Sequence, residues 1–326
     1  MPFSTHLKSF LQMTSKSSKI KHFTDLNLIP KKDLEEILKL AKKLKKQNSP
    51  TRHKKKLAGK NLAMIFEKNS TRTRVSFEVA INHLGGHGIV MNKSDMQLGK
   101  GETVADTAKV LSRYVDAIMI RCDEHRTIME LARNSCVPII NALSDFSHPC
   151  QILASIMAIE ENLKKSIKGK KLVWLGDQNN VLNSYIHACA NFGYELVISS
   201  PEDIFSSELE LKKAKKKGAN ISVVSNPKKA VKDADVIITD TWFSMGDEAT
   251  KNDALKQRKL NLLMPYQVNE SLMKLAKKDA IFTHCLPAYR GFEVTSDVID
   301  SKASIVFDEA ENRLHVQKAI LLWTMK

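Results

Sequence analysis

The sequence contains no uninterrupted run of about 18 apolar residues, the length that a membrane-spanning helix needs. Its five cysteines are an odd number and include no CxxC pair, so neither a disulfide framework nor a zinc knuckle is indicated. The chain also lacks a GK[ST] loop and a GxGxxG fingerprint, which argues against a P-loop and against a nicotinamide dinucleotide site. We therefore expect a protein of a reducing, cytoplasmic compartment with no membrane contact, no metal and no cofactor.

Arginine is scarce among the basic residues, although the net charge is +15. Only ten of the 51 basic residues are Arg, and the lysines come in runs such as Lys54–Lys56 and Lys215–Lys217. No aromatic residues are interleaved with these runs for base stacking, as nucleic-acid binding by stacking needs. The charge pattern therefore favours a solvated lysine-rich surface, with anion attraction as the open alternative and nucleic-acid binding not expected.

The 326 residues suffice for two domains, and short apolar runs alternate with segments of helical periodicity. This alternation predicts parallel sheets with helices on both faces: an α/β fold of two doubly wound domains, with the active site in the cleft between them. The predicted strands are 61–66, 88–91, 117–121, 137–141, 171–176, 195–199, 236–239 and 280–283. The predicted helices are 34–46, 72–84, 104–113, 126–134, 152–161, 182–191, 208–217 and 268–277.

One segment has the features of an anion site. An apolar strand ends at Phe66, and Ser70-Thr71-Arg72-Thr73 opens the next helix. Backbone N–H groups at a helix start, hydroxyl groups and a guanidinium together suit a phosphate. The alternative is that Ser70 only caps the helix while Arg72 and Arg74 point to water.

Four further segments carry polar side chains after predicted strands or at helix starts. In His148-Pro-Cys-Gln151, both His148 and Gln151 can donate to an oxygen that gains charge, although a lone histidine is more often structural. Asn180 can offer an amide to a small polar ligand, and Asp240 can pair with an ammonium group or cap a turn. Cys285 follows His284, but neighbours on a strand point to opposite faces, so a Cys–His nucleophile is not favoured.

The order of these segments resembles the ornithine carbamoyltransferases, over about residues 22–326. Ser70-Thr-Arg-Thr73 and His148-Pro-Cys-Gln151 are similar to the whole aspartate/ornithine carbamoyltransferase family. Two segments are similar to the ornithine-specific members, Ser244-Met245-Gly246 and His284-Cys-Leu286-Pro287. Arg121 and Glu309-Ala-Glu-Asn-Arg313 complete the resemblance.

The resemblance implies transfer of a carbamoyl group from carbamoyl phosphate to the δ-amine of L-ornithine, giving L-citrulline and phosphate. It implies these residues at the carbamoyl phosphate site: Ser70, Thr71, Arg72, Thr73, Gln97, Arg121, His148, Gln151, Cys285, Leu286 and Arg313. Ornithine would meet Asn180, Asp240, Ser244 and Met245. The catalytic residues would be Arg121, His148, Gln151, Asp240 and Cys285. No metal is expected, because guanidinium groups supply the positive charge.

The same resemblance implies a homotrimer whose sites are shared, with Gln97 lent by the neighbouring subunit. It divides the chain into a flexible extension at 1–21, a carbamoyl phosphate domain at 22–147, an ornithine domain at 148–308 and a C-terminal helix at 309–326 that packs back on the first domain. We expect the enzyme to serve arginine biosynthesis. A catabolic role, or a putrescine, N-acetylornithine or aspartate substrate, remains the alternative.

Overall fold

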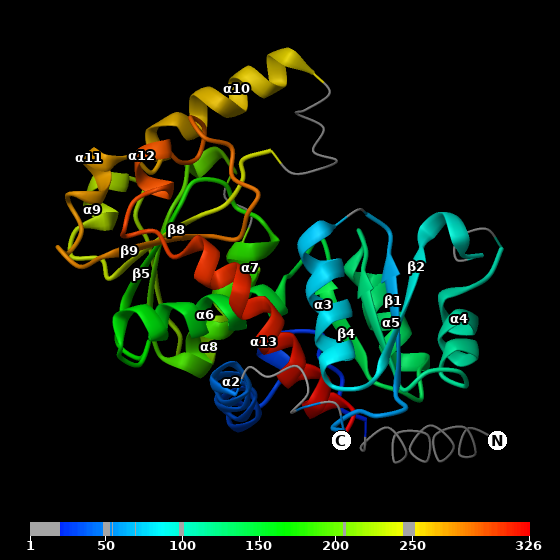
Figure 1. Cartoon of the computed structure of the whole chain (residues 1–326). Coiled ribbons are helices and arrows are strands. Elements are labelled where there is room, and N and C mark those ends of the chain that lie inside the picture. The colour runs from blue at the N-terminus through cyan, green and yellow to red at the C-terminus, as the bar shows by residue number, and fades with distance from the viewer. Residues whose placement is uncertain are drawn as a thin grey trace, which may run out of the picture.

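The structure, a computed structural model, describes residues 20–47, 53, 55–68, 70–97, 101–204, 207–243 and 252–326. Almost all of the predicted N-terminal extension lies outside these residues. Within the described residues, the strands form a four-stranded and a five-stranded sheet in which all neighbouring strands are parallel (Figure 1). The predicted α/β fold is therefore confirmed.

The first sheet has the strand order β2-β1-β3-β4. Alternate residues of its strands enter two different cores: Leu62 and Met64 of β1 join one, and Ala63 and Ile65 join the other. Both faces are thus covered by helices, which explains why these strands read as continuous apolar runs. The elements of this half are β1 (Asn61–Phe66), α3 (Thr71–His83), β2 (His87–Asn92), η3 (Lys93–Asp95), α4 (Val104–Leu111), β3 (Ala117–Arg121), α5 (His125–Asn134) and β4 (Ile139–Leu143).

The second sheet has the strand order β7-β6-β5-β8-β9 and the same two-sided burial. Its strands are β5 (Lys171–Leu175), β6 (Glu195–Ser199), β7 (Asn220–Val223), β8 (Val236–Thr239) and β9 (Ile281–His284). Its helices are α7 (Asn180–Phe192), η4 (Glu202–Ile204), α8 (Glu208–Lys216), α9 (Pro227–Val231), α10 (Asp253–Leu263), η6 (Met264–Tyr266), α11 (Glu270–Met273) and α12 (Ser296–Ile299).

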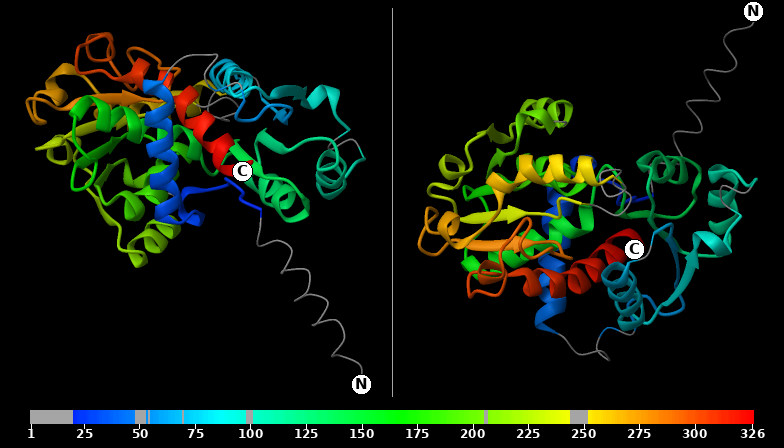
Figure 2. Two further views of the ribbon diagram at one scale, coloured as in Figure 1. Left: turned by 60° about the horizontal axis from the view of Figure 1, so that its bottom comes forward. Right: turned by 90° about the horizontal axis from the view of Figure 1, so that it is seen from above.

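Three long helices join the halves, together with the short η2 (Leu26–Leu28). They are α2 (Lys31–Lys46), α6 (Pro149–Leu163) and α13 (Val306–Thr324). Helix α13 packs against α2, α6 and α3 and runs from the second sheet toward the first (Figures 1 and 2). One apolar core contains Met64, Trp174 and Ile320 together, so it extends through both halves. The predicted domain boundaries remain a prediction.

Each sheet has a point where the chain reverses its direction of winding. In the first sheet this point lies between β1 and β3, and in the second it lies between β5 and β8. The loops that leave two such strands diverge and open a crevice at their carboxyl ends, which is where ligands bind in folds of this kind. Ser70 and Arg121 lie at the first of these points, and Asn180 and Asp240 lie at the second.

The structure differs from the predicted elements in a few places. The helix predicted at 268–277 is only the short α11, because Val268 instead forms a bridge to Val294. The edge strand β7 and the helix α10 were not predicted: β7 is short and mostly exposed, and α10 buries only Leu263. Among the described residues no helix combines the length and apolarity needed to cross a bilayer.

We predict that Asp235→Asn destabilises the second half of the molecule. The Asp235 carboxylate lies 3.2 Å from the ammonium of Lys170 and 2.9 Å from that of Lys277, and it accepts the backbone N–H of Lys171 at 2.9 Å. Burial alone would raise the pKa of Asp235, but these donors outweigh it and lower the pKa below its usual value. The variant should lose about 1–3 kcal/mol of unfolding free energy near neutral pH.

Because the folded-state pKa of Asp235 is depressed, this stabilisation is present above the unfolded-state pKa of about 4 and is lost as the pH falls through the folded-state value. Urea denaturation at neutral and acidic pH measures the difference between wild type and variant, which should shrink in acid. Asp279→Asn, a matched change at an exposed neighbouring position, should have little effect. An equal loss at both positions would contradict the prediction.

Candidate active site

The amino end of α3 supplies backbone donors. Ser70 caps the helix, and its hydroxyl oxygen accepts the N–H of Thr73 at 3.3 Å. The N–H groups of Thr71 and Arg72 belong to the first turn and have no intrahelical acceptor. Both side chains are exposed, whereas that of Thr73 is buried. This end of α3 therefore has N–H groups without intrahelical acceptors and an exposed guanidinium, which are groups that suit an anion.

Arg313 reaches this helix from α13 and is 3% exposed. Its guanidinium donates to the Thr73 hydroxyl at 3.1 Å and to the side-chain oxygen of Gln151, at the start of α6. A guanidinium can only donate, so the Thr73 hydroxyl accepts here and keeps its own proton for another acceptor. Side chains from three separate segments thus meet at one point.

Arg121, at the end of β3, and His148, the residue before α6, lie in the same electrostatic environment. Burial first, and then the charges of Arg313 and Arg72, lower the pKa of Arg121 to about 10. The pKa of His148 is held well below its usual value by burial first and then by Arg313, Arg121 and Arg72. These shifts show a surplus of positive charge gathered in a buried place.

The same groups have unused hydrogen-bonding atoms. Arg121 Nε, Arg313 Nε and His148 Nδ1 are buried and have no hydrogen-bond partner among the described residues. Buried polar atoms are almost always paired, so three orphans in one cluster indicate a ligand-binding site. Their positive surroundings select an anion.

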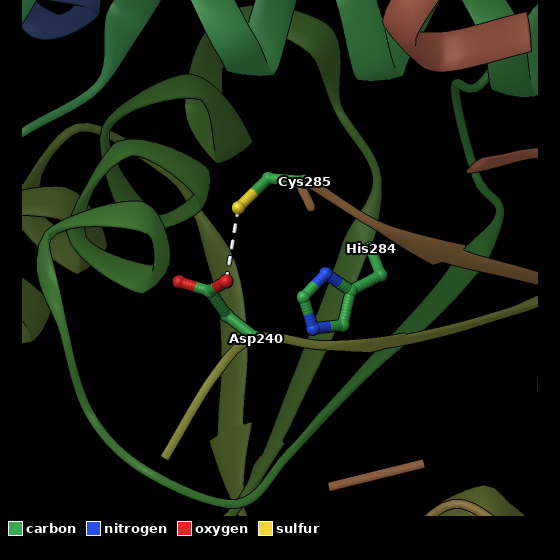
Figure 3. A group of neighbouring side chains, drawn as sticks. All are labelled: Asp240, His284 and Cys285. Atoms are coloured by element: carbon green, nitrogen blue, oxygen red, sulfur yellow. Dashed lines mark hydrogen bonds between the residues drawn. The ribbon is translucent and has the colours of Figure 1, made fainter. Parts of the chain in front are cut away.

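A second cluster lies where β8 and β9 end (Figure 3). The Cys285 thiol donates to one carboxylate oxygen of Asp240 at 2.9 Å, and the amide of Asn179 donates to the other at 2.7 Å. Burial raises the pKa of Cys285 well above its usual value, and the charge of Asp240 raises it further. The sulfur is therefore a protonated thiol at neutral pH, which does not suit a covalent nucleophile.

His284 is not hydrogen-bonded to this thiol among the described residues. Its Nδ1 accepts the N–H of Leu286 at 2.8 Å, and its Nε2 lies 3.3 Å from Glu293. Asp240, His284 and Cys285 bring potential metal ligands within 4.8 Å of one another. A metal would need a thiolate, and the Cys285 thiol instead donates to Asp240, so the group fits a hydrogen-bonded polar cluster better than a metal centre. Leu286 has a φ of +57°, a conformation that is strained for leucine and is typical of functional sites.

The remaining predicted residues are not joined to either cluster by a side-chain hydrogen bond among the described residues, or lie outside those residues. Asn180 uses its side-chain N–H to bond the backbone oxygen of Ser144 at 2.6 Å, so it ties α7 to the segment after β4. Gln97 follows η3 and is exposed, and no hydrogen bond among the described residues joins it to the cluster. Ser244 and Met245 lie outside the described residues.

Asn179 and Thr283 were not among the predicted site residues, and Glu309 had only been part of a motif. Asn179 caps α7 by accepting the N–H groups of Val181 and Leu182, and it also holds Asp240. Its position beside Asn180 at a helix start was the available signal. Thr283 and Glu309 form a buried contact with each other that the sequence spacing gives no means of finding.

Comparisons with known proteins show which proteins the chain is similar to. The model described as "Aspartate/ornithine carbamoyltransferase, carbamoyl-P binding domain" matches residues 21–161, and the model described as "Aspartate/ornithine carbamoyltransferase, Asp/Orn binding domain" matches residues 168–324. The ornithine carbamoyltransferase of Rhodopseudomonas palustris is 51% identical over 306 residues, which cover 94% of this chain and 96% of that protein.

Solved structures are similar as well. The ornithine carbamoyltransferase of Pyrococcus furiosus is 49% identical, with a TM-score of 0.86 over 94% of this chain and 97% of that one. The anabolic ornithine carbamoyltransferase of Campylobacter jejuni is 42% identical, with a TM-score of 0.85 over 93% of this chain and 98% of that one.

We predict that Asp240→Asn lowers the pKa of the Cys285 thiol. The substitution keeps an oxygen that can accept from the thiol but removes the negative charge that opposes its ionisation. Ultraviolet absorbance of the thiolate, titrated with pH, measures the change. Subtracting the spectrum of the matching Cys285→Ser protein isolates this thiol from the other cysteines. A pKa that stays the same or rises would show that Asp240 does not set it.

Proposed function

The chain belongs to the aspartate/ornithine carbamoyltransferase family, and we propose that it transfers the carbamoyl group of carbamoyl phosphate to the δ-amine of L-ornithine in the direction of arginine biosynthesis. The observation that carries the proposal is the buried positive cluster with three unpaired side-chain nitrogens beside the amino end of α3. Carbamoyl phosphate is a small anion with a carbonyl group. It needs positively charged groups for its phosphate and hydrogen-bond donors for its carbonyl oxygen.

The phosphate end of the substrate is assigned to the amino end of α3. Ser70, Thr71 and Arg72 would hold the phosphate oxygens through backbone N–H, hydroxyl and guanidinium groups, with Arg121 as a second guanidinium. Two guanidinium groups and a helix start stabilise the charge that the phosphate gains as it leaves. Burial and the charges of Arg313 and Arg72 lower the pKa of Arg121, and such an anion would neutralise those charges.

The carbonyl oxygen is assigned to His148, Thr73 and Arg313. The Thr73 hydroxyl retains a proton to donate, and His148 Nδ1 and Arg313 Nε are unpaired. These donors would stabilise the oxyanion that forms when the amine adds to the carbonyl carbon. Gln151 presents its oxygen beside Arg313, so we assign it as an acceptor for the carbamoyl N–H rather than as a donor. The backbone at Leu286 completes this end of the site.

Ornithine is assigned to Asp240, Cys285, Asn180, Ser244 and Met245. A δ-ammonium has a pKa of about 10, so the neutral amine costs about 4 kcal/mol at neutral pH. The carboxylate of Asp240 and the Cys285 thiol, which bond each other at 2.9 Å, would orient the amine. The amine nitrogen forms a bond to the carbonyl carbon, the carbon–oxygen bond to phosphate breaks, and the departing phosphate accepts the proton.

The cellular role is part of the proposal. The solved relative from Campylobacter jejuni carries the description anabolic, which supports biosynthesis over a catabolic role. The five cysteines, at 122, 136, 150, 189 and 285, are free, as suits a reducing cytoplasm. The carbamoyl phosphate domain at 22–147 and the ornithine domain at 148–308 stay as proposed, with α13 joining both.

We also propose a homotrimer with shared active sites. The edge strand β2 leaves Ile89 40% exposed, and the adjoining α3 leaves Val75 54% exposed. An open strand edge beside exposed apolar side chains is a surface that a second copy can cover. Gln97 follows this edge in the chain and is exposed, so it is free to enter a neighbouring site.

A substrate panel tests the proposed reaction. With carbamoyl phosphate, the enzyme should show kcat/KM for L-ornithine at least about 100-fold above the values for N-acetylornithine, putrescine and L-aspartate, because buried polar partners reject analogues that leave them unpaired. Phosphate release and mass spectrometry of the carbamoylated product measure this ratio. A higher value for one of the three analogues would replace ornithine as the substrate.

Mixed oligomers test the shared site. Arg72→Ala and Gln97→Ala should each abolish most activity, whereas Arg74→Ala, a matched change at an exposed position two residues further along α3, should retain it. After denaturation and refolding together at equal amounts, the two inactive variants should regain about a quarter of wild-type activity, since a site is intact when one subunit supplies Arg72 and its neighbour supplies Gln97. No recovery, with trimers present by light scattering, would show that each subunit holds a complete site.

A further inference from the structure

Glu309 is a buried acid with no assigned role in the reaction. It lies in the first turn of α13 and is 2% exposed. One of its carboxyl oxygens accepts from the Gln151 side-chain amide, and the other accepts from the Thr283 hydroxyl. No ammonium or guanidinium hydrogen-bonds to it among the described residues. Burial raises the pKa of Glu309. Burying a carboxyl group costs free energy of folding, so the presence of this acid in the interior needs an explanation.

The contacts of Glu309 fix which way the Gln151 amide points. Gln151 donates its nitrogen to Glu309 and accepts Arg313 at its oxygen. Arg313 is only a donor, so a reversed amide would place N–H against guanidinium and oxygen against the carboxyl oxygen. The amide therefore has a single orientation, with its oxygen facing the positive cluster.

Gln151 and Arg313 form part of one chain of hydrogen bonds. It runs from Thr283 on β9 through Glu309, Gln151 and Arg313 to Thr73 on α3. Each of these hydrogen bonds restricts the next side chain to one orientation. The Gln151 oxygen keeps a second lone pair, and the Thr73 hydroxyl keeps its proton, so both remain available to a ligand.

We propose that Glu309 is a positioning residue for carbamoyl phosphate: it does not touch the substrate but sets the Gln151 amide, and through it the Arg313 guanidinium, in the binding orientation. This inference rests on the proposed function, because it names carbamoyl phosphate as the ligand of the cluster. It predicts that Glu309 affects carbamoyl phosphate much more than ornithine, and that it does so only through Gln151.

Substitutions of Glu309 test the inference. Glu309→Leu removes both acceptors at similar volume and lets the Gln151 amide turn, so the KM and the calorimetric Kd for carbamoyl phosphate should rise about tenfold. The KM for ornithine should stay within about twofold. Glu309→Gln keeps an oxygen for the Gln151 amide and can donate to the Thr283 hydroxyl, so its rise should be at most about threefold. Asp308→Leu, at the exposed neighbouring position, is the matched control.

A double-mutant cycle separates positioning from a merely structural role. In a Gln151→Ala background, Glu309→Leu should add no further loss of carbamoyl phosphate affinity. An additive loss, or equal rises in both KM values, would overturn the inference. Should Glu309→Leu fail to fold, Glu309→Gln decides: a loss above about tenfold would mean that the charge of Glu309 acts on the ligand directly.

The wild-type protein keeps the two proposals distinguishable. Wild type that binds carbamoyl phosphate but makes no citrulline would contradict ornithine as the substrate and leave the Glu309 measurements valid through Kd. Wild type that makes citrulline while the Glu309 variants fail the cycle would overturn only the positioning role. Wild type without affinity for carbamoyl phosphate would overturn both.

Discussion

The site depends on buried positive charge whose hydrogen-bonding nitrogens are not all paired within the described residues. Arg313 and His148 are almost completely buried, and the pKa values of Arg121 and His148 are lowered by burial first and then by the charges of the neighbouring arginines. Removing a guanidinium from water is expensive unless a partner replaces the water. The interior around this cluster supplies too few acceptors, so the folded protein carries an electrostatic cost at this place. An anionic ligand removes that cost on binding, which is why affinity and specificity for an anion arise together.

The two parallel sheets explain how side chains so far apart in the sequence meet. Each sheet reverses its winding once, and the strands on either side of the reversal end in the segments that carry the chemistry. Gly176, after β5, has a φ of +104°, and an added Cβ would lie 2.7 Å from Trp242 Nε1. Only glycine allows the chain to leave β5 so close to the segment after Asp240. Helix α13 then brings Arg313 and Glu309 to the same region from the end of the chain.

Much of this arrangement could be predicted from the sequence, because its determinants are local or periodic. Buried strands such as β1 and β3 have continuous apolar runs, and the cap at Ser70 is visible as a residue type before a helix. Glu309 could not be given its role in this way. Its meaning comes from Gln151 and Thr283, which are 158 and 26 residues away in the chain. Nothing in the local pattern around a buried acid tells which distant donor it meets.

Asn180 shows a different limit. Its residue type and its place at the start of α7 suit a ligand contact, yet its amide holds the backbone of Ser144. The neighbouring Asn179, which the same pattern could equally have selected, holds Asp240. The sequence thus located the polar helix start but did not show which neighbouring group each of its two amides bonds, because the rotation of the helix about its axis decides which one faces the sheet. That rotation is set by the apolar side of α7, where Leu182, Tyr185 and Ile186 are buried in the core. The packing of the core therefore determines the chemistry of the site at its edge.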